Sequence, residues 1–341
     1  MKIKLSLTTL SPYHSAPVSG GAFVVTDEGR IVKKSGGAAG SPLTRTYQEP
    51  HYLASTGETV QFPVIRSLQI SKALRNITTR NIYNSLQDRN LRLAKISTYA
   101  GMEVGAASGK PAQMTPTLEQ VSRSLHTPIA LFGGGSYSLK STLAIGDGVL
   151  LHEQLVENEL VSRPDHVETS KISNSESYQL TYPVPITRND PVDKVSFEGA
   201  ADLNAVEDYQ QQVSEWQGTV TEAQTKRKAD SAEKKTDLNN LVACEAVVRG
   251  VVFVSELSLP DNTGLATKGA VINALLEATR DGLCIGGRIS RGMGKLKLTA
   301  SIDGEILNDQ TAVSNFESEL NEYSNWLDEV TPNELAEFYE L

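Results

Sequence analysis

Two kinds of hydrophobic spacing divide the chain into strands and helices. Apolar and polar residues alternate in residues 2–10 and again in residues 295–302, which is typical of half-buried strands. Residues 67–82 and 269–280 instead carry apolar side chains at intervals of three and four, as an amphipathic helix does. The sequence therefore predicts that both spacings occur in one folded unit.

Further strands are expected between these elements. A short hairpin is predicted at Ala22–Val32, and a glycine turn at residues 133–135 leads into a strand that ends at Gly146-Asp147-Gly148. Residues 178–183 alternate and favour a protruding hairpin. Cys244–Leu259 is rich in valine and predicts one strand, bent at Gly250.

The remaining segments are more polar. Long loops are expected at residues 11–60 and 98–114, a short helix at residues 117–125, and a long polar helix or helical pair at residues 203–235. An apolar stripe near the C-terminus predicts one further amphipathic helix with an acidic opposite face. This stripe comprises Phe316, Leu320, Tyr323, Leu327 and Val330.

In chain order the best-patterned segments read strand, helix, strands, strand, helix, strand. This order predicts an α+β fold with a ferredoxin-like or RRM-like core, in which an antiparallel sheet has helices on one face and carries large insertions. The length of 341 residues fits two domains, or one domain with such insertions.

Composition narrows the class of protein. No apolar run is long enough for a membrane span, and the two cysteines, Cys244 and Cys284, favour a reducing cytoplasm over a disulfide framework. Neither cysteine has a close Cys or His partner in sequence, so no zinc site or other cofactor is expected.

The net charge of −9 argues at first against nucleic acid. However, residues 303–341 hold eleven acidic residues and no Lys or Arg, which leaves +2 for residues 1–302. A basic surface is therefore possible on the body of the protein, because local patches matter more than totals.

The strongest candidate for chemistry is the loop from Gly282 to Lys295. Its glycines have no side chains that would block a ligand, and Arg288, Arg291 and Lys295 add positive charge with no acid between them. Such a loop lets backbone N–H groups approach a phosphate while cations neutralise it. The sequence therefore predicts that this loop binds a nucleic-acid backbone.

A second basic region lies around the first predicted helix, with Ser67 as its expected N-cap. Residues 66–95 hold seven Lys or Arg and one acid, Asp88. A solvated helix face is the simpler interpretation. The shortage of acids for i, i+4 pairs favours an anionic partner.

The sequence also resembles the RAMP superfamily of CRISPR effector proteins. The likeness rests on the glycine loop at 286–294, on Ser11-Pro12-Tyr13-His14 followed by the Pro-led segment 62–75, and on Leu131-Phe132-Gly133 followed by residues 143–147. Length and insertions are most similar to a Cas-seven-like backbone subunit, especially that of the type IV (Csf) systems.

This resemblance implies a cytoplasmic, non-enzymatic subunit that binds guide RNA (crRNA) and oligomerises along it. Its partners would be the guide, target DNA or RNA, further copies of itself and other effector subunits, with no membrane. The implied parts are a palm (1–12, 62–96, 129–151 and 242–302), a Gly-rich insertion (13–61), a finger insertion (97–128), a hairpin plus helical insertion (152–241) and an acidic tail (303–341). Either 13–61 or 152–241 would supply the thumb.

Basic pattern and resemblance together imply a set of RNA-binding residues. This set comprises His14, Arg66, Ser67, Lys72, Arg75, Arg80, Gly133, Gly134, Lys140, Gly286, Gly287, Arg288, Arg291, Gly292, Gly294 and Lys295. Contacts of this kind give sequence-independent, salt-sensitive binding.

Two alternatives remain open. Some relatives cut target RNA with an acidic loop residue and a metal, and Asp27 is the candidate here, although a turn residue is the simpler interpretation. A small-molecule phosphate enzyme is the other alternative, but a Rossmann loop follows a strand and this loop follows a helix. The sequence contains no nucleophile elbow, His-Glu-x-x-His or Walker motif, so no catalytic residue is assigned.

Overall fold

The structure is a computed structural model of the whole chain. It describes residues 1–15, 23–25, 31–33, 41–105, 128–134, 140–186, 208 and 242–339. The predicted helices at 117–125 and 203–235, and Asp27, lie outside these residues.

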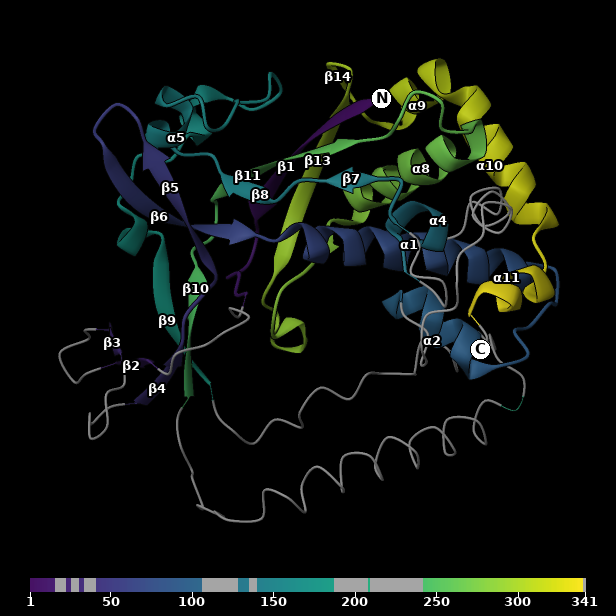
Figure 1. Cartoon of the computed structure of the whole chain (residues 1–341), viewed down its shortest axis with the longest axis horizontal. Helices are drawn as coiled ribbons and strands as arrows, with labels where there is room; N and C mark the ends of the chain where they lie inside the picture. The colour runs from purple at the N-terminus through teal and green to yellow at the C-terminus, as the bar shows by residue number, and fades with distance from the viewer. Residues whose placement is uncertain are drawn as a thin grey trace, which may run out of the picture.

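The strands form two sheets, and most of the helices gather on one side of the main sheet (Figure 1). The helices are α1 (Ser67–Asp88), α2 (Ile96–Val104), α4 (Pro128–Phe132), α5 (Glu153–Glu157), α8 (Leu265–Asp281), α9 (Asp309–Asn315), α10 (Glu317–Glu329) and α11 (Pro332–Tyr339), with single 3-10 turns η1 (Thr169–Lys171), η2 (Ser177–Gln179) and η3 (Ile289–Arg291). The strands are β1 (Lys2–Thr9), β2 (Phe23–Val25), β3 (Ile31–Lys33), β4 (Ser41–Thr44), β5 (Gln48–Leu53), β6 (Glu58–Ile65), β7 (Ala144–Ile145), β8 (Gly148–Leu150), β9 (Thr181–Ile186), β10 (Val242–Val247), β11 (Val252–Ser258), β12 (Leu283–Cys284), β13 (Lys295–Ile302) and β14 (Glu305–Ile306).

The main sheet confirms the predicted fold class. Its central order is β13-β1-β11-β8, every neighbouring pair is antiparallel, and α1 and α8 connect the strands as in a ferredoxin-like β-α-β-β-α-β unit. Ile3, Leu5 and Leu7 of β1 are buried, as their alternation predicts. The core lies between this sheet and the helices.

The main sheet is wider than the sequence predicts. The hairpin β5–β6 joins its edge through β8, where Val64 lies opposite Val149. Part of residues 41–60 is therefore strand and not loop, and Phe62 belongs to β6 instead of leading directly into a helix. Four consecutive buried residues at the end of β6 explain this pairing, because they complete the core beneath α1.

A second, smaller sheet stands below the main one in Figure 1, with the order β3-β2-β4-β10-β9. The predicted hairpin at Ala22–Val32 is present as β2 and β3. The protruding hairpin predicted around residues 178–183 is instead the turn η2 followed by β9, which pairs with the distant strand β10. The prediction of one strand over Cys244–Leu259 is wrong. Gly250 has φ +85° and divides it into β10 in the second sheet and β11 in the main sheet.

The start of α1 also differs from the prediction. Arg66 occupies the N-cap position, and Ser67 makes no side-chain cap. Instead the Ser67 N–H donates to the Asp147 carboxylate at 2.5 Å. Asp147 comes from the Gly146–Gly148 turn, at which the predicted strand ends as β7 and after which β8 begins. A carboxylate distant in sequence thus satisfies the helix start.

The loop expected at 98–114 begins as a helix, α2, because the side chains of Thr98 and Met102 are buried against the rest of the protein. Gly105 ends this helix in the left-handed conformation at φ +73°. Similarly, residues 128–132 form the short helix α4 before the predicted glycine turn.

The predicted C-terminal stripe lies on α10 and its two cap residues, and two further helices, α9 and α11, flank it. Tyr323 is 2% exposed, and Phe316, Leu320 and Leu327 pack partly buried against the core. Figure 1 shows α8 between the sheet and α10. Within the described residues, no helix is long and apolar enough to cross a bilayer.

A glycine in α8 allows this close packing. A Cβ on Gly269 would lie 2.0 Å from the Glu319 carbonyl oxygen and 2.8 Å from the Tyr323 Cβ. Backbone atoms of α10 therefore occupy the space in which other residues carry a side chain.

We expect Gly269→Ala to lower the free energy of unfolding by about 1–3 kcal/mol, because α10 must move away from α8. Helix propensity alone would raise it by about 1 kcal/mol. Urea unfolding measures the sign, with Asn321→Ala on the exposed side of α10 as a control. A stabilised Gly269→Ala variant would contradict this packing.

Candidate nucleic-acid interface

The glycine loop connects α8 to β13. Gly282 ends α8 with φ +76°, β12 pairs briefly with β13, and η3 forms the tip of the loop. Arg288 and Gly292 flank η3, and both have left-handed backbone, at φ +65° and +75°. A non-glycine residue in this region is uncommon, so the loop holds Arg288 in a specific orientation.

The loop lies against the segment that follows β1. The N–H groups of Gly287 and Gly294 donate to the carbonyls of His14 and Pro12, each at 2.8 Å, and the Lys295 N–H donates to Ser11 Oγ at 2.8 Å. Two stretches that carry the family resemblance, nearly 300 residues apart in sequence, therefore meet in space.

Two glycines make this contact possible. A Cβ on Gly286 would lie 2.5 Å from the His14 carbonyl oxygen, across the contact. One on Gly294 would lie 1.9 Å from the carbonyl oxygen of Ile285, on the other arm of the loop itself. Any other residue would push the two backbones apart. Gly292 has open space around it and serves the turn through its positive φ alone.

The tip of the loop presents donors and positive charge. In the described part of the chain, the N–H groups of Arg288, Ile289 and Ser290 donate no hydrogen bond, and Arg288 and Lys295 form no ion pair. Consecutive N–H groups without an acceptor in the described part of the protein, next to guanidinium groups, match the oxygens of a phosphate.

The second sheet packs against this loop. Met293 packs with Cys244 and Ala246 of β10 in one apolar cluster. Burial raises the pKa of the Cys244 thiol, and the adjacent Arg288 and Arg291 guanidinium groups partly oppose that rise. Both arginines therefore lie at the junction of the two sheets.

A buried carboxylate fixes this junction. Glu245 of β10 is 1% exposed, and it accepts hydrogen bonds from the Thr46 N–H at 3.0 Å and from Thr181 Oγ1 at 2.9 Å. Arg45 Nε lies 3.4 Å from the same carboxylate. Two segments, residues 45–46 and Thr181 at the start of β9, compensate this charge, so Glu245 ties both of them to β10.

The first turn of α1 completes the neighbourhood. The Tyr13 hydroxyl donates to Gln69 Oε1 at 2.5 Å, and Gln69 Nε2 donates to Ser15 Oγ at 2.9 Å. Arg66 lies over the Tyr47 ring, 5.2 Å from its centroid. Arg66 therefore stands beside the same 11–15 segment that supports the glycine loop.

His14 has a structural position in this site. Its ring is 4% exposed, and Nδ1 donates to the Glu245 carbonyl at 2.7 Å. A buried ring does not present itself to a strand of RNA, so the structure favours a supporting role for His14 over the direct contact that the sequence predicts. Burial lowers its pKa, and Arg288 lowers it further.

Several predicted residues lie elsewhere and are engaged within the protein. Arg75 is buried and donates to the carbonyls of Phe132 and Gly133, at 3.0 and 2.9 Å. A Cβ on Gly134 would lie 1.7 Å from the Gly105 carbonyl oxygen, so this glycine allows a packed junction. Lys72 and Lys140 are exposed.

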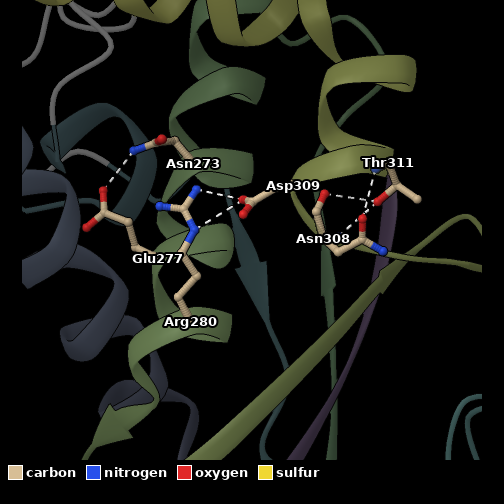
Figure 2. A network of polar contacts seen from close by, with 6 residues as sticks. All are labelled: Asn273, Glu277, Arg280, Asn308, Asp309 and Thr311. Atoms are coloured by element: carbon tan, nitrogen blue, oxygen red, sulfur yellow. Dashed lines mark hydrogen bonds and ion pairs between the residues drawn. The ribbon is translucent and has the colours of Figure 1, made fainter.

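Arg80 belongs to the helical layer. It donates to Glu277 at 2.9 Å, and Asn273 reaches the same carboxylate at 3.0 Å. In Figure 2 the neighbouring Arg280 points to Asp309, with which it forms an ion pair at 2.7 Å. The Arg80 contact joins α1 to α8, and the Arg280 pair attaches α9 to α8, so Arg80 is paired with a carboxylate of the protein itself.

Sequence reasoning missed several residues of this site, namely Arg45, Tyr47, Gln69 and Glu245. Each lies in a segment predicted as a loop or as an unremarkable part of a strand or helix. A charged residue inside the apolar β10 segment was the one available signal, because a buried carboxylate requires partners. The catalytic alternative at Asp27 lies outside the described residues.

Comparison with known proteins supports the resemblance at the level of the fold. No protein-family model and no curated protein matches the sequence. Among solved structures, a chain described as "Type IV-B CRISPR Complex" matches with a TM-score of 0.50 and 13% identity, over 89% of this chain and 91% of that chain. The two chains share a fold across nearly their whole length.

The burial of His14 predicts a pH dependence of stability. Its pKa is lowered in the folded state from an unfolded value of about 6.5. The unfolded chain therefore takes up a proton first as the pH falls. The contribution of His14 to stability is complete above about pH 6.5 and declines below it.

We expect the free energy of unfolding to fall between about pH 7.5 and about pH 5.5 in urea titrations, and to fall less in His14→Gln. Glutamine keeps an N–H donor for the Glu245 carbonyl but does not titrate. The pKa values of His51, His152 and His166 are also lowered by burial. These three residues are present in the wild type and in the variant, so the difference in pH slope reports on His14. An identical pH slope would contradict this role.

Proposed function

We propose that this chain is a guide-RNA-binding backbone subunit of a type IV-like CRISPR effector complex. The observation that carries the proposal is the glycine loop, which combines unpaired N–H groups with arginines. The fold that holds this loop is shared with a chain of such a complex. The loop binds the sugar–phosphate backbone and not the bases, so the subunit accepts any guide sequence.

The two sheets suggest two different parts of the subunit, a palm and a thumb. The main sheet with α1 and α8 acts as the palm that carries the loop. The second sheet combines β2–β4, from the Gly-rich insertion, with β9, from the later insertion. We therefore assign both insertions to one thumb-like element, which stands beside the arginines of the loop.

In this proposal the chain has a binding role and no catalytic one. Further copies line up along the guide, other effector subunits complete the ribonucleoprotein, and the target is recognised by base pairing with the guide. Arg66, Arg288, Arg291 and Lys295 provide the charge, whereas His14, Arg75 and Glu245 hold the binding elements in place.

Charge reversal tests the loop. For Arg288→Glu with Arg291→Glu, we expect weaker binding of single-stranded RNA, with a slope of log K against log salt that is smaller by about 1.4, or about 0.7 for each lost phosphate contact. The melting temperature should stay the same, because both side chains are partly exposed at the junction of the two sheets.

The matched control is Arg92→Glu with Lys171→Glu, two exposed residues on other elements that give the same change in net charge. Fluorescence anisotropy at several salt concentrations measures both. If the loop variant and the control have the same affinity and slope, the loop is not part of the binding site.

Assembly is tested separately. The chain co-expressed with a repeat-derived guide should purify with that RNA as a multimer, whose mass by light scattering grows with guide length. An RNA-free monomer under these conditions would refute the scaffold function. Cleavage of a bound target at regular intervals would instead favour the endoribonuclease alternative.

A further inference from the structure

The strands β1 and β13 have two very different faces. Toward the helices they present buried aliphatic side chains, such as Leu5 and Leu298. The residues that point the other way are Lys2, Lys4, Ser6 and Thr8 on β1, and Lys295, Lys297, Thr299 and Ser301 on β13. Four of these eight residues are lysines and four carry hydroxyl groups, with no acid and no apolar side chain. The lysines are exposed, Thr8 and Thr299 are half-buried, and Ser6 and Ser301 are buried.

Strand register joins the eight residues into one surface, which we call the lysine track. Lys297 lies opposite Thr8, Thr299 opposite Ser6, and Ser301 opposite Lys4. Side chains on the same face of a strand repeat every ~6.7 Å. The track therefore extends for about 25 Å along the two strands.

The lysines of the track are exposed and have free ammonium groups. Across the residues that the structure describes, none of the four side-chain amines takes part in an ion pair or hydrogen bond. Glu256 of β11 lies opposite Lys4 and is the acid that neighbours the track in register. The Ser6 hydroxyl, in the middle of the track, is buried and bonds to His166 at 2.9 Å.

The rest of this sheet face is covered. Val252 and Val254 of β11 pack with Leu151 and Val167, so the segment after β8 shields that side of the sheet. A hollow lined by Lys2, Lys4, Gly146, Glu256 and Ser258 remains open beside the track. The uncovered part of the sheet is thus its most basic part.

The track starts at the glycine loop. Gly294 belongs to the loop, and Lys295, the next residue, is the first lysine of the track. A polyanion held by Arg288 and Arg291 therefore meets a line of cations and hydroxyl donors directly beyond them, with no intervening carboxylate on β1 or β13.

We propose that the lysine track is a second binding surface for the sugar–phosphate backbone of a single-stranded nucleic acid, continuous with the glycine loop. This inference rests on the proposed function and extends its footprint along the sheet. Lysines attract phosphates as point charges, and the half-buried Thr8 and Thr299 hydroxyl groups donate to their oxygens. Aromatic side chains are missing from the eight positions, so bases do not stack here.

The test compares Lys4→Glu with Lys297→Glu in the full chain against the loop variant and against Arg92→Glu with Lys171→Glu. The probes are a guide-length uridine oligomer and a short one that spans the loop alone. We expect the track variant to bind the long oligomer with a salt slope smaller by about 1.4, while its affinity for the short oligomer equals that of the control.

The outcomes separate the two proposals. If the wild-type chain binds neither oligomer, the proposed function fails. If the wild type binds and the loop variant does not, but the track variant matches the control on both oligomers, the track proposal is overturned and the function stands. Loss of self-association by the track variant with unchanged RNA affinity would also overturn it, since the lysines would then contact a second copy.

Discussion

The site depends on the close contact between the backbone of the glycine loop and the segment after β1. The N–H groups of Gly287 and Gly294 donate to the carbonyls of His14 and Pro12, and no side chain separates the two backbone segments. This contact positions η3 at the end of the main sheet, where its N–H groups face outward. Without it, Arg288 would be one cation on a surface loop and not part of a cradle.

A buried charge links this contact to the second sheet. Glu245 is surrounded by protein, and its carboxylate is satisfied only while Arg45, Thr46 and Thr181 stay in place. Its backbone carbonyl also accepts from His14. Removing one partner of such a charge costs more than the pair contributes to stability, so the arrangement favours one geometry of the two sheets.

The basic residues of the chain divide into two groups with different physical roles. Arg75 and Arg80 bind carbonyls or a carboxylate of the protein itself, and they hold helices and turns together. Arg288, whose guanidinium group interacts with the Cys244 thiol, and the lysines of β1 and β13 form no ion pair among the described residues. Density of charge along the sequence does not distinguish these groups, because the distinction depends on which acceptors the fold brings near.

The sequence by itself determined the ferredoxin-like order of strands and helices, the apolar stripe of α10 and the glycine loop, since periodicity and glycine content are local properties. Only the tertiary structure decided that Asp147 and not Ser67 caps α1, that the strand predicted at 244–259 divides between two sheets, and that His14 is buried. Each of these outcomes depends on a partner that is distant in sequence. Local patterns encode which residues seek burial or hydrogen bonds, whereas the identity of the partner is fixed when the chain packs.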